Sequence, residues 1–113
     1  MAGRAEPSAP PGDVAVVIPA YQAAATLRDV VGRVRRAVPP ATVYAVDDGS
    51  SDRTGQHARD SGAIVLTHRQ RQGKGAALRT GIARALADGA RLLVTLDADG
   101  QHAPDDIPRL LAP

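Results

Sequence analysis

Short apolar segments alternate with helix-like segments along this chain, and this alternation restricts the fold more than any other feature. Residues 14–18 form a continuous apolar run that ends at Pro19, and similar runs cover residues 42–46, 63–67 and 91–96. Uninterrupted apolar runs of this length are typical of strands buried on both faces of a parallel sheet. The chain is therefore predicted to be an α/β protein in which right-handed crossovers join parallel strands.

The segments between these strands carry the signals of helices. Apolar residues recur every three or four positions over residues 27–38, which predicts an amphipathic helix that ends before the proline pair at 39–40. A second helix is predicted over residues 53–60, with Ser51 or Asp52 as its cap. Leu78, Ile82 and Leu86 mark a third helix, and Pro104 suits the first turn of a fourth.

The composition limits the size class and the partners. The 113 residues fit a single domain, with residues 1–12 expected to form a disordered tail and residues 13–113 the folded part. Cysteine is absent, which excludes disulfides and thiolate metal sites. No apolar run approaches the roughly 20 residues that span a bilayer. The net charge of +2 comes with dispersed cations and few aromatics, so nucleic-acid binding is not expected.

The expected topology places several strand exits together. In the common doubly wound order the first strand lies between the second and the fourth, and ligands bind outside the carboxyl ends where the strand order reverses. Residues 19–21 and 97–99 are then expected to face each other across a crevice, with Asp47 one strand away. The sequence therefore predicts a ligand site at this edge of the sheet.

Asp97, Ala98 and Asp99 follow the fourth apolar run. An extended backbone places residues two positions apart on one side, so both carboxylates are aimed at one point. Mg²⁺ or Mn²⁺ suits such a pair, because these ions bind oxygen ligands and share carboxylates with substrate phosphates. The amide oxygen of Gln101 is expected to reach the same ion. The alternative is an ordinary turn, since Asp and Gly both favour turns.

Two further segments offer groups to a nucleotide. Asp47 or Asp48, after the second strand, has a carboxylate that accepts hydrogen bonds from a nucleobase or ribose, or else belongs to a turn. Arg69, Arg71 and Lys74 lie in a glycine-containing loop that opens the third helix, which favours contacts to a diphosphate. This loop matches neither a Walker A motif nor a dinucleotide fingerprint, and a solvated basic loop is the alternative.

Four segments occur in a set order along the chain: VIPAY at 17–21, VDDGSSDRT at 46–54, GKGAALRTG at 73–81 and LDADGQHAP at 96–104. With these segments, about residues 14–112 resemble the family 2 glycosyltransferases, and within them the dolichol- or polyprenyl-phosphate mannosyltransferase branch. The resemblance implies a GT-A fold, a three-layer, Rossmann-like arrangement with a parallel sheet. It also implies that a nucleotide-diphosphate sugar is bound with Mg²⁺ or Mn²⁺.

The resemblance assigns roles by motif position. Pro19, Tyr21 and Asp47 would hold the nucleoside, with Ala45 beside it. The segment from Asp97 through Ala98 to Asp99 would contact the diphosphate sugar, its two carboxylates would bind the metal, and Gln101 would be a further ligand. The family's transfer inverts the sugar, and a polyprenyl phosphate is the implied acceptor. An acidic residue is usual where this chain has Ala23, so the resemblance leaves GDP-sugars and UDP-sugars both open as donors.

The acceptor-binding half of the family is not visible in this sequence, so a domain truncated after the fourth strand and the following helix is expected. A catalytically incomplete nucleotide- and metal-binding fragment, which needs a partner or the missing half, is the alternative to an enzyme. A phosphotransferase of the haloacid dehalogenase kind also uses Asp-x-Asp, but its motif has Thr or Val two residues after the second Asp, and this chain has Gln101 there. The sequence therefore disagrees with this alternative. Residues 92–96 are expected to be an unprotected apolar edge through which copies self-associate. A lipid-phosphate acceptor implies a cytoplasmic protein, peripheral at the cytoplasmic membrane face.

Overall fold

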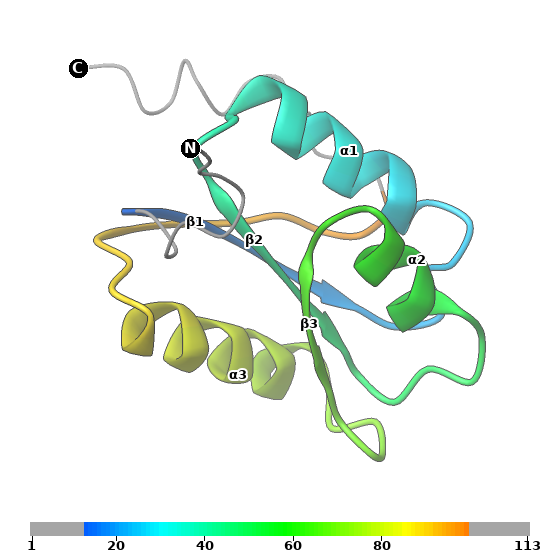
Figure 1. The fold of residues 1–113 in the computed structure, drawn as a ribbon. Coiled ribbons are helices and arrows are strands. Elements are labelled where there is room, and N and C mark those ends of the chain that lie inside the picture. The colour runs from blue at the N-terminus through cyan, green and yellow to red at the C-terminus, as the bar shows by residue number, and fades with distance from the viewer. Residues whose placement is uncertain (1–12, 100–113) are drawn as a thin grey trace.

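The structure, a computed structural model, describes residues 13–99 and shows a parallel sheet with helices on both faces (Figure 1). The helices α1 and α2 cover one face, and α3 covers the other. The predicted three-layer α/β architecture is therefore confirmed. The elements in chain order are β1 (Val14–Ala20), α1 (Leu27–Ala37), β2 (Thr42–Asp47), α2 (Thr54–Asp60), β3 (Ile64–Thr67), α3 (Lys74–Ala87) and β4 (Leu92–Thr95).

The strands pair in the order β3-β2-β1-β4, and all pairs are parallel. This is the predicted order, with β1 between β2 and β4. The register pairs β1 with β2 as far as Ala20 and Asp47, whereas pairing with β4 ends at Val17 and Thr95. The carboxyl ends of β1 and β4 therefore separate, and a space is left beside the last residues of β1.

Pro19 lies inside β1, whereas the sequence predicted that the strand would end there. The carbonyl of Val17 accepts a hydrogen bond from Leu96 N, and alternate residues of a strand face the same neighbour. The nitrogen of Pro19 therefore faces the side of β4, where strand pairing has already ended. Its missing N–H breaks no bond of the sheet, which explains why proline is tolerated in a central strand.

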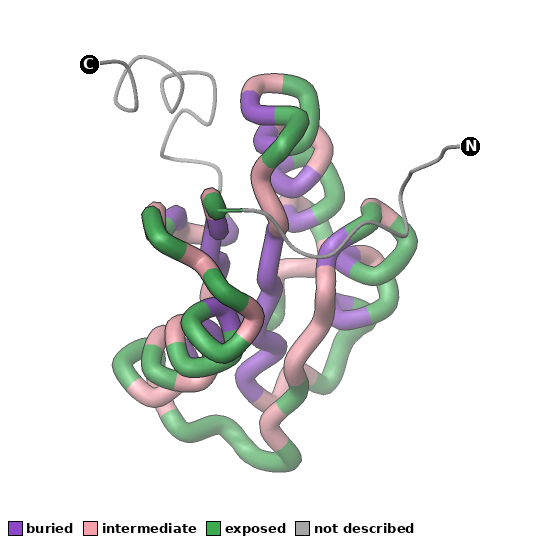
Figure 2. Tube along the Cα trace, turned by 60° about the vertical axis from the view of Figure 1, so that its left-hand side comes forward, coloured by how far each residue is buried: buried purple, intermediate pink, exposed green. Residues whose placement is uncertain are grey.

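Buried residues gather along the central strands of the sheet (Figure 2). Val16, Ile18 and Leu27 belong to the cluster beneath α1 and α2, and Val17 and Val46 to the cluster above α3. Alternate residues of β1 thus enter opposite layers, as required of a strand with helices on both sides. The strand β4 (Leu92–Thr95) is more exposed, and within the described residues it forms one edge of the sheet.

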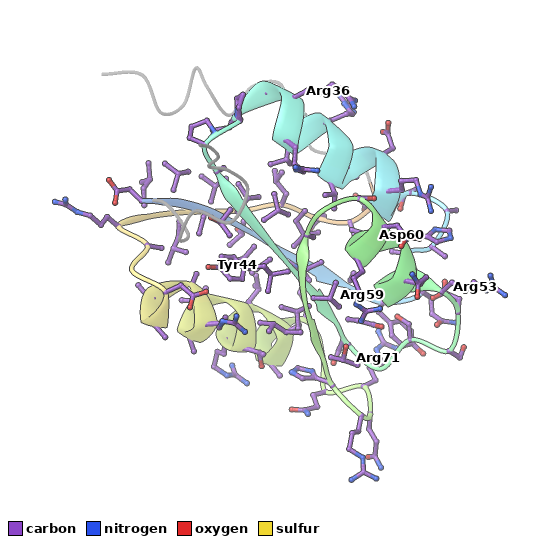
Figure 3. The ribbon with its side chains drawn as sticks, in the orientation of Figure 1. Arg36, Tyr44, Arg53, Arg59, Asp60 and Arg71 are labelled. Carbon is purple, nitrogen blue, oxygen red and sulfur yellow. The ribbon has the colours of Figure 1, made fainter. Side chains whose placement is uncertain are left out.

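Tyr44 is an aromatic residue in a core that otherwise consists of aliphatic side chains. It lies on β2 between the sheet and α3 (Figure 3), and its hydroxyl donates a hydrogen bond to Asp88 Oδ2 at 2.7 Å. Burial and this hydrogen bond raise the pKa of Tyr44 to about 12. The phenol therefore joins β2 to the end of α3 that lies far from the carboxyl ends of the strands.

The face of α3 that packs on the sheet consists of small residues. The leucines and isoleucine that mark this helix in the sequence are partly buried or, in the case of Leu86, 56% exposed. The fully buried positions are instead Ala77, Gly81 and Ala85, four residues apart. Small side chains let the helix axis approach the valines of β1 and β2 closely. The buried face of α3 is therefore the one with the smallest side chains, not the one with the largest apolar side chains.

The remaining predictions on the fold concern the ends of the chain. The tail over residues 1–12 and the fourth helix near Pro104 lie outside the described residues. Between residues 13 and 99, no helix combines the length and apolar character that crossing a membrane requires.

Candidate functional site

A pocket of about 490 Å³ lies at the carboxyl ends of β1 and β4, where the two strands separate. The order of strands reverses at this place, because the chain runs from β1 outward through β2 to β3 and then returns to the other side of β1. Ligands of open α/β sheets bind at such a reversal. The position of the pocket is therefore the one predicted from the sequence.

Most of the predicted site residues line this pocket. They come from the end of β1, from the residue after β2, from the loop before α3 and its first residue, and from the segment after β4, and they are Pro19, Tyr21, Asp48, Arg71, Lys74, Asp97, Ala98 and Asp99. Ala45, Asp47 and Arg69 do not line it, and Gln101 lies outside the described residues. The fold thus brings acidic, basic and aromatic side chains from four separate segments to one cavity.

The acidic side of the pocket is the segment Asp97 to Asp99. Asp97 Oδ1 forms an ion pair with Lys74 Nζ at 2.6 Å, so a cation already lies beside this carboxylate. The hydroxyl of Thr26 donates a hydrogen bond to the carbonyl of Ala98 at 2.5 Å, which fastens the segment to the loop after β1. Within residues 13–99, no group of three or more His, Cys, Asp or Glu side chains is arranged to hold a metal ion.

The aromatic side of the pocket is Tyr21, which is 42% exposed. The guanidinium of Arg71 lies over its ring, with Cζ 4.1 Å from the ring centroid. A cation at this distance is attracted to the negative face of the ring. The pocket therefore presents a planar apolar surface next to positive charge, a combination that suits a base attached to phosphates.

Asp47 and Ala45 lie deeper in the sheet. The Oδ1 atom of Asp47 accepts a hydrogen bond from Ser50 N at 3.0 Å, and its Oδ2 is close to Gly55 in the first turn of α2. The residue is only 8% exposed, and Ala45 is 1% exposed. Asp47 therefore shapes the turn after β2, and its predicted contact to a nucleoside stays a prediction.

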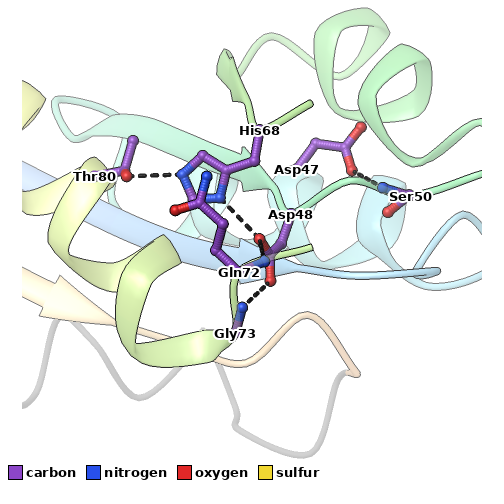
Figure 4. A network of polar contacts seen from close by, with 7 residues as sticks. All are labelled: Asp47, Asp48, Ser50, His68, Gln72, Gly73 and Thr80. Carbon is purple, nitrogen blue, oxygen red and sulfur yellow. Dashed lines mark hydrogen bonds and ion pairs between the residues drawn. The ribbon is translucent and has the colours of Figure 1, made fainter. Parts of the chain in front are cut away.

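Asp48 is engaged differently from its neighbour. Its Oδ1 accepts hydrogen bonds from Gln72 N and is 2.8 Å from His68 Nδ1, while Oδ2 accepts from Gly73 N (Figure 4). The Nε2 atom of His68 lies 2.8 Å from Thr80 Oγ1. Burial alone would raise the pKa of Asp48, but these hydrogen bonds outweigh it and hold the pKa below its ordinary value of 3.8. Asp48 lines the pocket, and its carboxylate is thus kept ionised there.

The loops after β1 and β2 are joined by hydrogen bonds. Gln22 has a φ of 52°, which is uncommon for a residue with a side chain. Its Oε1 accepts hydrogen bonds from Ser51 N at 2.7 Å and Asp52 N at 3.4 Å, and its own N donates to Ser50 Oγ at 2.9 Å. These bonds offset the cost of the backbone conformation and fix the wall of the pocket next to Tyr21.

Asp52 continues this junction. Its Oδ2 accepts a hydrogen bond from Ala24 N, and its Oδ1 accepts from the backbone N and the hydroxyl of Thr54. The hydrogen bond from the Thr54 hydroxyl is the largest cause of a lowered pKa for Asp52. The predicted cap at Ser51 or Asp52 is wrong, because the N-cap of α2 is Arg53, whose side chain makes no capping hydrogen bond. Asp52 lies one residue earlier, and its carboxylate joins the start of α2 to the loop after β1.

The sequence reasoning missed several residues that build the site. Gln22, Thr26 and His68 were given no role there, although each is fixed by side-chain hydrogen bonds to another segment of the site. No local sequence pattern predicts these contacts, because Gln22 bonds to a residue 29 positions away and Thr26 to one 72 positions away. The only available signal for Asp48 was its position directly after Asp47 at the end of a strand.

A parallel sheet between helices, with a polar pocket at the reversal of strand order, defines an α/β domain of the nucleotide-binding type. The comparisons with known proteins agree with this class. The chain belongs to glycosyl transferase family 2, whose family model matches residues 15–113.

Two curated relatives have names that refer to polyprenyl carriers. The polyprenol monophosphomannose synthase of Mycolicibacterium smegmatis is 41% identical over 102 residues, which cover 85% of this chain and 38% of the relative. The undecaprenyl-phosphate mannosyltransferase of Micrococcus luteus is 40% identical over 103 residues, which cover 87% of this chain and 42% of the relative. The chain thus spans about two fifths of the length of these relatives.

The fold is also found in solved structures of the glucosyl-3-phosphoglycerate synthase of Mycobacterium tuberculosis. One structure matches with a TM-score of 0.73 and 31% identity, covering 88% of this chain and 40% of the synthase. Another, in complex with Mn²⁺, UDP-glucose and phosphoglyceric acid, matches with a TM-score of 0.69 and 29% identity, covering 84% of this chain and 36% of the synthase. The recognised family and the fold class are therefore both confirmed.

Proposed function

We propose that this chain provides the nucleotide-sugar site of a family 2 glycosyltransferase. The observation that carries the proposal is the single pocket into which Tyr21, Arg71, Lys74, Asp97 and Asp99 converge. A nucleotide-diphosphate sugar has an aromatic base, a ribose and two phosphates, and this set of side chains offers a matching group for the base and for the charges. The pocket volume of about 490 Å³ lies within the range of about 300–1,000 Å³ found for small-molecule sites.

Each part of the donor has candidate partners. We assign the nucleoside to Tyr21, together with Pro19 and the neighbouring Asp47 and Ala45. The diphosphate would be met by Arg71 and Lys74, which the loop before α3 presents to the pocket. Arg69 is exposed and does not line the pocket, so we expect it to contribute through its charge. Charge-assisted contacts of this kind are stronger than neutral ones, so the diphosphate is expected to supply much of the affinity.

The carboxylate oxygens of the pocket are suitable ligands for Mg²⁺ or Mn²⁺. These ions bind oxygen ligands and need only one or two protein carboxylates when phosphates complete the shell, so the lack of a larger ligand cluster between residues 13 and 99 is no obstacle. Asp97 and Asp99 would hold the ion, and Gln101 is the proposed further ligand. When bound, the ion would neutralise negative charge on the leaving nucleoside diphosphate. Asp97 attracts a cation in the structure itself, because Lys74 Nζ lies 2.6 Å from it.

The acceptor proposal rests on the relatives. Those from M. smegmatis and M. luteus are named for polyprenol and undecaprenyl phosphate. We infer that the whole protein carries out an inverting transfer to a polyprenyl phosphate at the cytoplasmic face of a membrane. We expect the 113-residue chain to contain the donor site. Measuring transfer of labelled sugar to a lipid phosphate distinguishes an enzyme from a non-catalytic binding fragment.

Calorimetric titration with UDP and with GDP, each with and without Mn²⁺, tests the donor site. One of the two nucleotides is expected to bind in a Mn²⁺-dependent manner. Asp99→Asn should weaken that binding about 10- to 100-fold, which corresponds to the loss of one interaction with a charged group. Asp60→Asn is the matched control, because Asp60 lies exposed on α2, outside the pocket, where it pairs with Arg28 (Figure 3). Absence of binding for both nucleotides would refute the proposal.

A further inference from the structure

Asp48 accepts hydrogen bonds from the backbone directly before α3. The N-cap position of this helix is Gly73, which has no side chain and a φ of 102°. The carboxylate of Asp48 reaches across from the end of β2 and accepts from the backbone N–H groups of Gln72 and Gly73, each at 2.8 Å. It therefore fixes the two residues that lead into the helix.

His68 completes the connection. Its Nδ1 lies 2.8 Å from Asp48 Oδ1, and its Nε2 lies 2.8 Å from Thr80 Oγ1 in the second turn of α3 (Figure 4). The side chains of His68 and Asp48 are only 9% and 4% exposed, so water competes little for these bonds. The ends of β2 and β3 and the first two turns of α3 are therefore tied together at one buried point.

The two anchored N–H groups lie between the two cations of the pocket. Arg71 directly precedes Gln72, and Lys74 directly follows Gly73. The side chain of Lys74 is 63% exposed, and Arg71 is exposed as well. Long exposed side chains have many rotamers, so the backbone from which they project must limit where their charges can lie. That backbone is held by Asp48.

We propose that Asp48 and His68 are positioning residues, which act through the backbone of residues 72–73 to hold Arg71 and Lys74 where a nucleoside diphosphate binds. This inference rests on the proposed function and adds to it a pair of residues that need not touch the reacting atoms. It assigns the two adjacent aspartates different tasks, because Asp47 bonds within its own turn whereas Asp48 bonds to the loop of the cations.

The effect of positioning differs from a loss of stability. If Asp48 and His68 only stabilised the fold, their substitution would weaken the binding of every ligand to a similar extent. If they position the cations, affinity for the diphosphate falls while affinity for the nucleoside does not. The informative quantity is therefore the ratio of the two dissociation constants, measured with uridine and UDP or with guanosine and GDP, in the presence of Mn²⁺.

The variants are His68→Leu, which removes both hydrogen bonds of the imidazole, and Asp48→Asn, which replaces one acceptor oxygen by a donor. Each is expected to weaken binding of the nucleoside diphosphate about tenfold, as for one interaction with a charged group, and to leave nucleoside affinity unreduced. His68→Asn keeps a donor near the position of Nδ1 and should restore most of the affinity for the diphosphate.

Tyr44→Phe is the matched control. It removes another hydrogen bond between β2 and α3, the one from Tyr44 to Asp88, at the far end of the helix. This variant should lower the thermal midpoint and leave the ratio of affinities unchanged. Equal losses for nucleoside and diphosphate in His68→Leu and Asp48→Asn, or a change of the ratio in Tyr44→Phe as large as theirs, would overturn the inference. If the unsubstituted chain binds neither ligand, the proposed function itself fails.

Discussion

Replacing Gly81 with alanine tests how closely α3 packs against the sheet. A Cβ atom at this position would lie 3.0 Å from Val46 Cγ2 and closer still to Val17 Cγ1. Both valines are 0% exposed, and their branched side chains have little rotational freedom. The added methyl group therefore has no space unless the helix moves away from β1 and β2.

Gly32 in α1 is a matched position for calibrating the size of this effect. A Cβ there would meet only the flexible guanidinium of Arg36, with Nη1 at 3.2 Å. Gly32→Ala should therefore stabilise the chain by about 1 kcal/mol, the usual gain of alanine over glycine inside a helix. Gly81→Ala receives the same gain but adds an overpacking cost of about 1–3 kcal/mol. The two variants should thus differ in free energy of unfolding by about 1–3 kcal/mol, with Gly81→Ala the less stable.

Urea unfolding of the chain, followed by circular dichroism, measures this difference as a shift in midpoint at constant slope. Val17→Ala removes the methyl group that the new Cβ would meet, so combining it with Gly81→Ala should recover about 1 kcal/mol relative to additivity. Equal midpoints for the two alanine variants, or strictly additive effects of Val17→Ala and Gly81→Ala, would refute the reasoning that close packing excludes a side chain at residue 81.

Three other predictions follow from contacts described above. Lys74→Met removes the cation beside Asp97 and should tighten Mn²⁺ binding without nucleotide by about 1.5- to 5-fold, as expected for an exposed ion pair. The same variant should bind nucleoside diphosphate more weakly. Unchanged affinities in a Mn²⁺ titration followed by electron paramagnetic resonance would contradict this. The lowered pKa of Asp48 means that its contribution to stability is present above pH 3.8, the ordinary pKa, and is lost as pH falls through the lower value in the folded state. Urea midpoints measured down through this range should therefore decline more steeply for the unsubstituted chain than for Asp48→Asn, and parallel curves would argue against it. Leu92 is 44% exposed on the outer strand of the described sheet, so Leu92→Lys should reduce self-association in light scattering, provided that the unsubstituted chain associates as predicted.

The sheet could be predicted from the sequence because its determinants are local. Each strand is a short apolar run, the connections are long enough for a crossover, and parallel strands with helices between them have few allowed arrangements. The position of residues 19–21 opposite residues 97–99 followed from that order alone. The sequence alone therefore predicted the place of the pocket between them.

Features that depend on distances between remote segments could not be predicted in this way. Leu78, Ile82 and Leu86 correctly marked α3, and the first two pack partly buried against the core. That the most buried positions are Ala77 and Gly81 depends on how close the valines of the strands lie, and the sequence of the helix does not show this distance. The network of Asp48 has the same character, since its partners are two backbone N–H groups, which carry no sequence signal, and a histidine 20 residues away.

The carboxylates of the pocket follow β4, a strand of four residues in which Leu92 and Thr95 are exposed. Its register with β1 runs from Val14 to Val17, so the placement of Asp97 and Asp99 depends on a short run of backbone bonds together with the contacts of Thr26 and Lys74. A ligand that needs both carboxylates binds only while this strand is paired, and binding must therefore slow amide hydrogen exchange along β4. At the proposed donor site, any opening of this edge would lower the affinity by the fraction of molecules in which β4 is unpaired.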